Sequence, residues 1–140
     1  TEVELFQGGR IPLKDFAEKK QDRDILVRLI VKKTAGRFAY AAVRNQSTDF
    51  PVIACAASCV GGEYRLAVGA RPQKAMLLTV SEEQTEEIRK NGADAAAKIA
   101  EELAAQIPTQ DNMRASAAYR THLAKALIRR ALLTVTEEVQ

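Results

Sequence analysis

The amino-acid sequence changes character near residue 80, and this break constrains the fold more than any other feature. Residues 1–80 hold six of the seven glycines and six of the seven aromatic residues, whereas residues 81–140 are rich in alanine and glutamate. Glycine and aromatic residues suit strands and turns, and alanine and glutamate suit helices. Strands first and helices afterwards predict an α+β fold rather than alternating βαβ units.

Several strands are predicted in the first half. Residues 24–32 alternate, with Ile25, Val27, Leu29 and Val31 on one face and Arg28 on the other. Residues 52–60 are apolar almost throughout, which predicts a central strand covered on both faces. Glycines 61 and 62 predict a tight turn into a strand over 63–70, so these two strands form a hairpin. Shorter strands are expected over 3–6 and 76–80.

Three helices are predicted in the second half. Ser81 and Gln84 form a capping-box pattern, and Gly92 lies just past the end of that helix. A second helix starts at Asp94 and stops at Pro108, and the third runs from about 116 to near 139. The apolar stripe of the second consists of Ala96, Ile99, Ala100, Leu103 and Ile107, and that of the third of Tyr119, Leu123, Leu127 and Ala131.

Length, charge and hydropathy limit the classes of protein. A chain of 140 residues with 46% hydrophobic and 28% charged residues is the size of one globular domain, so we expect a single domain over 1–140. No apolar run reaches the roughly 18–20 residues of a membrane span. Basic residues are spread along the chain and mixed with acids, giving a net charge of only +3. We therefore expect no membrane and no nucleic-acid partner.

The side chains that most often carry chemistry are scarce. Cys55 and Cys59 lie roughly 13 Å apart along a strand, too far for a disulfide, and four thiolate ligands for a metal or cluster are lacking. They are interpreted as small buried apolar residues of a protein in a reducing, cytoplasmic compartment. His122 is the only histidine and has no evident partner. The glycine pairs at 8–9 and 61–62 match no phosphate-loop pattern and are interpreted as hairpin turns. The residues alone predict no catalytic group and no metal site.

Three segments in a fixed order give a resemblance to a known family. They are residues 44–52 (RNQSTDFPV), residues 64–72 (YRLAVGARP) with Lys74 and Ala75, and residues 116–132 (SAAYRTHLAKALIRRAL). Together they resemble the C-terminal domain of the FAD-binding subunit of molybdenum hydroxylases, the xanthine dehydrogenase and carbon monoxide dehydrogenase family. The opening of the chain, with Phe6, Gly8, Arg10 and residues 24–31, is similar to the family's entry into that domain.

The resemblance implies a three- or four-stranded antiparallel sheet packed against three helices. It also implies an oxidoreductase whose FAD is held by glycine- and serine-rich loops of a preceding domain, with molybdopterin and iron–sulfur clusters in partner subunits and NAD⁺ as a common electron acceptor. Those loops are absent from these residues, so we expect that this chain alone neither binds FAD tightly nor oxidises a substrate. The first residue is Thr1 rather than methionine, in keeping with a cut between two domains.

By the same resemblance, the candidate flavin-adjacent residues are Lys33, Arg44 and Asp49. Cationic side chains there would favour an anionic cofactor. In the alternative interpretation, Arg44 and Asp49 pair with each other or with chain neighbours to hold their loop. Tyr119 and Arg120 have a similar structural alternative, in which the ring packs on the sheet and the guanidinium ties down a loop. A different class of function also stays open, that of a stand-alone interaction or dimerisation module without a redox role.

Overall fold

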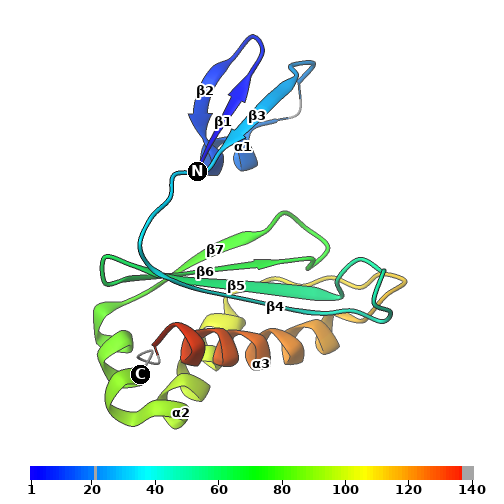
Figure 1. Cartoon of the computed structure of the whole chain (residues 1–140). Coiled ribbons are helices and arrows are strands. Elements are labelled where there is room, and N and C mark those ends of the chain that lie inside the picture. The colour runs from blue at the N-terminus through cyan, green and yellow to red at the C-terminus, as the bar shows by residue number, and fades with distance from the viewer. Residues whose placement is uncertain (21, 137–140) are drawn as a thin grey trace. The chain divides into compact units, whose positions relative to one another are not determined.

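The computed structural model describes residues 1–20 and 22–136, and the chain divides into two compact units, Thr1–Ala35 and Gly36–Gln140. Unit 1 contains the strands β1 (Glu2–Leu5), β2 (Gly9–Pro12) and β3 (Leu26–Ile30) and the short helix α1 (Leu13–Glu18). Its antiparallel sheet has the order β2-β1-β3 (Figure 1). The expectation of a single domain over 1–140 stays a prediction.

Unit 1 buries little apolar surface. Val3 and Leu5 are its only buried hydrophobic side chains among the described residues, whereas Ile25, Leu29 and Val31 are each more than half exposed. A carboxylate holds the turn between β1 and β2, because Asp24 accepts hydrogen bonds from the backbone N–H groups of Gln7 at 2.9 Å and Gly8 at 2.8 Å. These bonds lower the pKa of Asp24 below its ordinary value, since they favour the charged form.

Unit 2 is built on a four-stranded antiparallel sheet in the order β4-β5-β6-β7. Its strands are β4 (Arg37–Val43), β5 (Ile53–Val60), β6 (Glu63–Gly69) and β7 (Met76–Val80). The predicted hairpin between β5 and β6 is confirmed, and both turn glycines, Gly61 and Gly62, have positive φ angles of 60° and 85°. A two-residue turn of this kind needs left-handed backbone at both positions, which glycine adopts without steric cost.

Two helices cover one face of this sheet, α2 (Glu82–Ala105) and α3 (Ala117–Thr136) (Figure 1). The capping box at Ser81 and Gln84 is confirmed in both directions. Gly92 lies inside α2 rather than after it, with φ 57° and ψ −125°, so the two helices expected on either side of it are joined across a kink. None of the helices in the described part of the chain is long and apolar enough to span a membrane.

The core of unit 2 lies between the sheet and these helices. The inward face of the sheet contributes Ile53, Cys55, Leu66 and Val68, all completely buried. The stripe predicted on the second helical segment is confirmed, because all five of its residues are buried. Strands in the first half and helices in the second confirm the α+β fold class, and a second, three-stranded sheet accompanies the expected one.

Two sequence interpretations are wrong in detail. Strand β5 is not covered on both faces: its residues alternate between buried and half-buried, because the helices pack against only one side. On α3 the buried stripe begins with Arg120, at 1% exposure, whereas Tyr119 is 47% exposed and does not pack on the sheet. The side chain that is buried there is a charged one, which a hydrophobic pattern does not recognise. The expected end of this helix near residue 139 lies outside the described residues.

Candidate functional site

The face of the sheet opposite the helices carries small residues in its centre and large ones at its edges. Antiparallel pairing aligns Tyr40, Ala56, Ala67 and Leu77 in one row across the four strands. The next row consists of Phe38, Ser58, Arg65 and Thr79. Since directly paired residues share a face, the two central strands present alanine and serine between aromatic residues on β4 and leucine on β7. We call this surface the open face.

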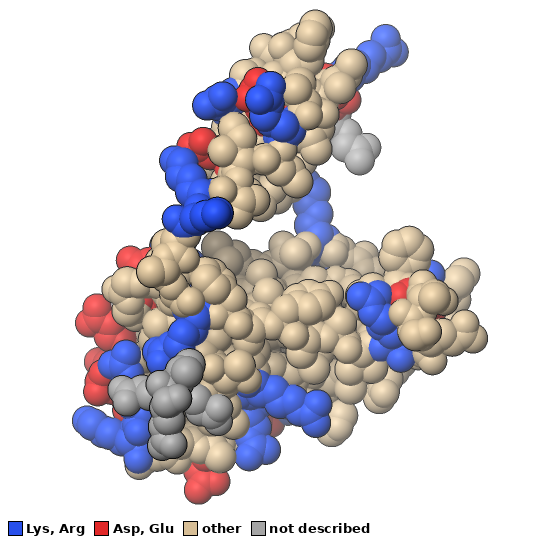
Figure 2. Space-filling view, viewed as in Figure 1, with Lys and Arg blue, Asp and Glu red and all other residues tan. Residues whose placement is uncertain are grey.

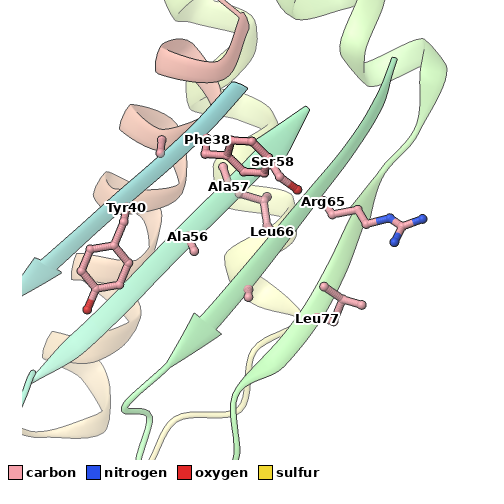
Figure 3. A pocket seen from close by; sticks show the side chains of 10 residues that line it. Phe38, Tyr40, Ala56, Ala57, Ser58, Arg65, Leu66 and Leu77 are labelled. Atoms are coloured by element: carbon pink, nitrogen blue, oxygen red, sulfur yellow. The ribbon is translucent and has the colours of Figure 1, made fainter. Parts of the chain in front are cut away.

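The size difference between the side chains hollows the open face into a trough of about 440 Å³. Figure 3 shows Phe38 and Tyr40 on its β4 side and Arg65 and Leu77 on the opposite side. Phe38 is 62% exposed, Tyr40 66% and Leu77 51%, so its rims are large apolar groups in contact with solvent. Contiguous exposed apolar surface of this kind is characteristic of sites of interaction.

A charged cluster lies on two loops at one end of the sheet, and we call them the loop pair: residues 44–52, between β4 and β5, and residues 106–116, between α2 and α3. Arg44 donates from Nη1 to the carbonyl oxygen of Asp49 at 2.7 Å. Arg44 and Asp49 are therefore brought together, as the structural alternative expected. In the view of Figure 2, basic and acidic side chains meet at the end of unit 2 where Figure 1 shows these loops, beside a largely uncharged surface.

Sequence reasoning missed two members of this cluster, Phe50 and Arg114. The Nε atom of Arg114 lies 3.2 Å from a carboxylate oxygen of Asp49, and its guanidinium lies 5.3 Å from the centre of the Phe50 ring. Asn45 links the two loops as well, through a 3.3 Å hydrogen bond to the carbonyl oxygen of Arg114. The Phe50 ring is 74% exposed, so the loop pair presents an aromatic surface with a cation against it. The contact between Arg114 and Phe50 joins residues 64 positions apart in the sequence, so no local sequence pattern predicts it.

Lys33 belongs to a different unit from Arg44 and Asp49. It lies in unit 1, after β3, and its side chain is exposed. The structure thus joins Arg44 and Asp49 and leaves Lys33 on the other unit. The position of all three beside a flavin stays a prediction.

The arginines of the two most specific motifs hold the loops to the sheet. Arg71 donates to the carbonyl oxygens of Lys74 at 2.8 Å and Pro108 at 2.9 Å. Arg120 donates to the carbonyl oxygens of Val52 at 2.7 Å and Ala70 at 2.6 Å and to the side chain of Asn112. The structural interpretation of Arg120, that it ties down a loop, is confirmed.

On the inward face, Arg37, Cys59 and Tyr64 form another cross-strand row. The guanidinium of Arg37 lies 3.2 Å from the Tyr64 hydroxyl and 3.7 Å from the Cys59 sulfur. Burial by itself would raise the pKa of Cys59, but hydrogen bonds from Tyr64 and Arg37 and the nearby positive charges outweigh it and leave that pKa lowered. Both cysteines are free and buried, as expected.

These surfaces offer little that would hold a cofactor on their own. Within residues 1–20 and 22–136, no three His, Cys, Asp or Glu side chains lie close enough together to bind a metal ion. The open face has one arginine, Arg65, and it pairs with Glu63 at 2.6 Å. The loop pair supplies two guanidinium groups and a ring, which suits contact with one edge of a flat anionic group.

The family of the chain follows from a sequence comparison. The model of the CO dehydrogenase flavoprotein C-terminal domain matches residues 38–135, which is more than half of the chain. The chain belongs to this family. The match lies within unit 2 and contains the loop pair and, except for one terminal residue of β4 and one of α3, the sheet and both covering helices. A comparison with curated proteins finds no match.

Solved structures support the same fold. Quinoline 2-oxidoreductase from Pseudomonas putida 86 aligns with a TM-score of 0.72 at 18% identity over 96% of this chain and 51% of that chain. Carbon monoxide dehydrogenase from Hydrogenophaga pseudoflava aligns with a TM-score of 0.59 at 18% identity over 96% and 52%. Reconstituted CO dehydrogenase from Oligotropha carboxidovorans aligns with a TM-score of 0.56 at 19% identity over the same shares. The chain therefore spans about half the length of these proteins.

Proposed function

We propose that this chain is the C-terminal part of the FAD-binding subunit of a molybdenum-containing dehydrogenase, where it covers the flavin region and makes contacts during electron transfer. The match to the CO dehydrogenase flavoprotein C-terminal domain over residues 38–135 carries the proposal. In this assignment FAD is bound by a preceding domain, molybdopterin and iron–sulfur clusters belong to partner subunits, and NAD⁺ is a candidate electron acceptor. The flavin would supply the redox chemistry, and this chain's residues would shape its surroundings.

The open face supports the contact part of the proposal. Its aromatic and leucine rims and its small-residue floor form an apolar surface with one arginine, and burying exposed Phe38, Tyr40 and Leu77 would yield roughly 25 cal/mol for each Å² removed from water. We assign this face to docking of the preceding FAD-binding domain.

The loop pair supports the flavin part. The carboxylate of Asp49 already has the guanidinium of Arg114 beside it, and Arg44 adds a second cation against the same loop. The cluster Arg44, Asp49 and Arg114 has a formal net charge of +1 and would favour an anionic, reduced flavin over a neutral one. Lys33 is proposed as a further cation on the flavin side.

The test uses the complete reading frame and the 140-residue chain side by side. We expect flavin absorbance at a stoichiometric level in the complete subunit and none in the chain alone. Stoichiometric flavin in the isolated chain, or a reading frame without a preceding FAD-binding segment, would overturn the proposal.

The docking face is tested when the preceding part and this chain are produced as two polypeptides. Phe38→Asp combined with Leu77→Asp should weaken their association at least tenfold, because a charge would be buried in an apolar contact. Ala97→Asp, which places a charge at an exposed site on α2, is the matched control and should leave association unchanged. Light scattering of the isolated chain distinguishes the stand-alone dimerisation module: a stable dimer that the double variant breaks would favour that function instead.

A further inference from the structure

Arg120 is a buried cation whose role the proposed function does not use. It is 1% exposed, and none of the ion pairs within the described part of the chain includes it. Its Nε atom has no hydrogen-bond partner. A buried charge without a carboxylate is unfavourable unless neutral acceptors surround it, so its remaining contacts decide what it does.

Those contacts come from three separate segments. The Nη1 atom donates to the carbonyl oxygens of Val52, just before β5, and Ala70, just after β6. The Nη2 atom donates to the side-chain oxygen of Asn112, in the connection between α2 and α3. The planar guanidinium offers its donors in a fixed fork, so three acceptors that bind it together are fixed relative to one another.

One of these acceptors belongs to a strained residue. Ala70 has a φ angle of 60°, in the left-handed region that non-glycine residues rarely adopt. The hydrogen bond from Arg120 to its carbonyl oxygen, at 2.6 Å, helps to hold this conformation.

The other two acceptors connect Arg120 to the loop pair. Val52 closes residues 44–52, and its backbone N–H donates to the carbonyl oxygen of Val43 at 2.7 Å. The side-chain oxygen of Asn112 that binds Arg120 also accepts a 2.9 Å hydrogen bond from the backbone N–H of Arg114. Arg120 thus binds one acceptor in each loop. Each acceptor lies within three residues of a member of the contact between Arg114 and Asp49.

We propose that Arg120 is the positioning residue of the loop pair: it fixes residues 44–52 relative to residues 112–115 and so places Arg114 against Asp49 and Phe50. Arg120 itself is buried. Its effect on a flavin would pass through these two loops, and this part of the inference rests on the proposed function.

The first test measures backbone hydrogen exchange in the 140-residue chain. In Arg120→Met, which keeps a similar volume without the donors, amides of residues 49–52 and 110–117 should exchange at least tenfold faster while β6 and α2 keep their rates. Arg120→Lys should fall between, since one ammonium cannot reproduce the fork. The matched control is Leu132→Ala, a completely buried site on the same helix, which should accelerate exchange across α2, α3 and the sheet together.

A second variant covers the case in which Arg120→Met does not fold. Asn112 is exposed, and Asn112→Ala removes one acceptor without disturbing the core. It should accelerate exchange in residues 112–117 alone, by severalfold. Unchanged rates in this segment, or loop rates in Arg120→Met that follow the global pattern of Leu132→Ala, would overturn the positioning role.

The second test separates this inference from the proposed function. In the complete subunit, the visible circular dichroism of the bound flavin should change in Arg120→Met and not in Leu132→Ala, since only the former moves the loops. Faster loop exchange with an unchanged flavin spectrum would show that the loop pair does not lie beside the flavin, and the positioning role would still hold. A changed spectrum without faster loop exchange would overturn the positioning role.

Discussion

Units 1 and 2 are both antiparallel sheets with helix attached, but they differ in what the sheet packs against. In unit 2, one face of the sheet lies on α2 and α3, and Leu66, Val68 and Ile99 are almost inaccessible to solvent. In the described part of unit 1, α1 is the only helix, and none of its six residues is buried. Antiparallel pairing joins neighbouring strands in both units, with one register shift in unit 1, between Glu4 and Leu5. The comparison therefore teaches that the buried apolar area distinguishes the two units more than the hydrogen bonding within their sheets does.

Removal of unit 1 is the strongest test of this difference between the two units. We expect residues 36–140 to fold without residues 1–35 and to melt within about 5 °C of the full chain, because a shift of that size corresponds to only about 1 kcal/mol. A peptide of residues 1–35 should be unfolded by circular dichroism, since it is below the size at which a core forms unaided. Loss of the helical signal from residues 36–140 would contradict the comparison.

A core truncation in unit 2 should have the next largest effect. Leu66→Ala leaves a cavity at a completely buried site between the sheet and the helices, and we expect a loss of about 2–5 kcal/mol in the free energy of unfolding. Urea denaturation followed by circular dichroism measures it. Leu77→Ala, at a half-exposed position on the open face, is the control and should cost less than about 0.5 kcal/mol. Equal losses in the two variants would show that the open face is packed in solution.

The two cysteines sharpen the comparison inside unit 2. Burial raises the pKa of Cys55 to about 12, whereas that of Cys59 is lowered and its sulfur lies beside Arg37. At pH 8 iodoacetamide should therefore label Cys59 at least about tenfold faster than Cys55, because the thiolate is the reactive species. Mass spectrometry of the digested chain gives both rates. In denaturant the rates should converge, and faster labelling of Cys55 in the native chain would contradict the burial of the inward face.

The smallest expected effect is a loss of stability of unit 1 at acidic pH. Three backbone N–H groups, the first being that of Gln7, lower the pKa of the Asp24 carboxyl, so the folded pKa lies below the unfolded one. The resulting stabilisation is complete above the unfolded value, near 3.8, and is lost as the pH falls through the lower folded value. NMR signals of β1–β3 should weaken there before those of unit 2. Asp24→Asn should weaken them already at neutral pH, and identical acid profiles for both units would contradict the prediction.

Much of unit 2 could be predicted from sequence, because its elements follow simple rules. The glycine pair at 61–62 and the capping box at Ser81 specify turn and helix start through local backbone chemistry. Strand β4 was not predicted from the sequence. Its large residues, Phe38 and Tyr40, lie on the exposed face of the sheet, and its alanines lie on the face that the helices cover. This reverses the pattern from which a half-buried strand is usually inferred.

The candidate site was less predictable, for a different reason. Arg44 and Asp49 could be selected by resemblance, and their contact is local. Arg114 joins them only through the tertiary fold, and Arg120 occupies a core position that a hydrophobic pattern assigns to its neighbour, Tyr119. Periodicity treats every charged residue as solvent-facing, so it misplaces the start of the α3 stripe, whereas Leu127 and Ala131 are buried as predicted.

The trough on the open face owes its depth to very few atoms. Ala56 and Ala67 are paired at its centre, and each contributes only a methyl group. Replacing either by leucine would fill the hollow from below and turn a concave surface into a convex one, without altering any residue of the core. The shape on which association depends is therefore encoded separately from the stability of the fold, and one could be redesigned while the other is kept.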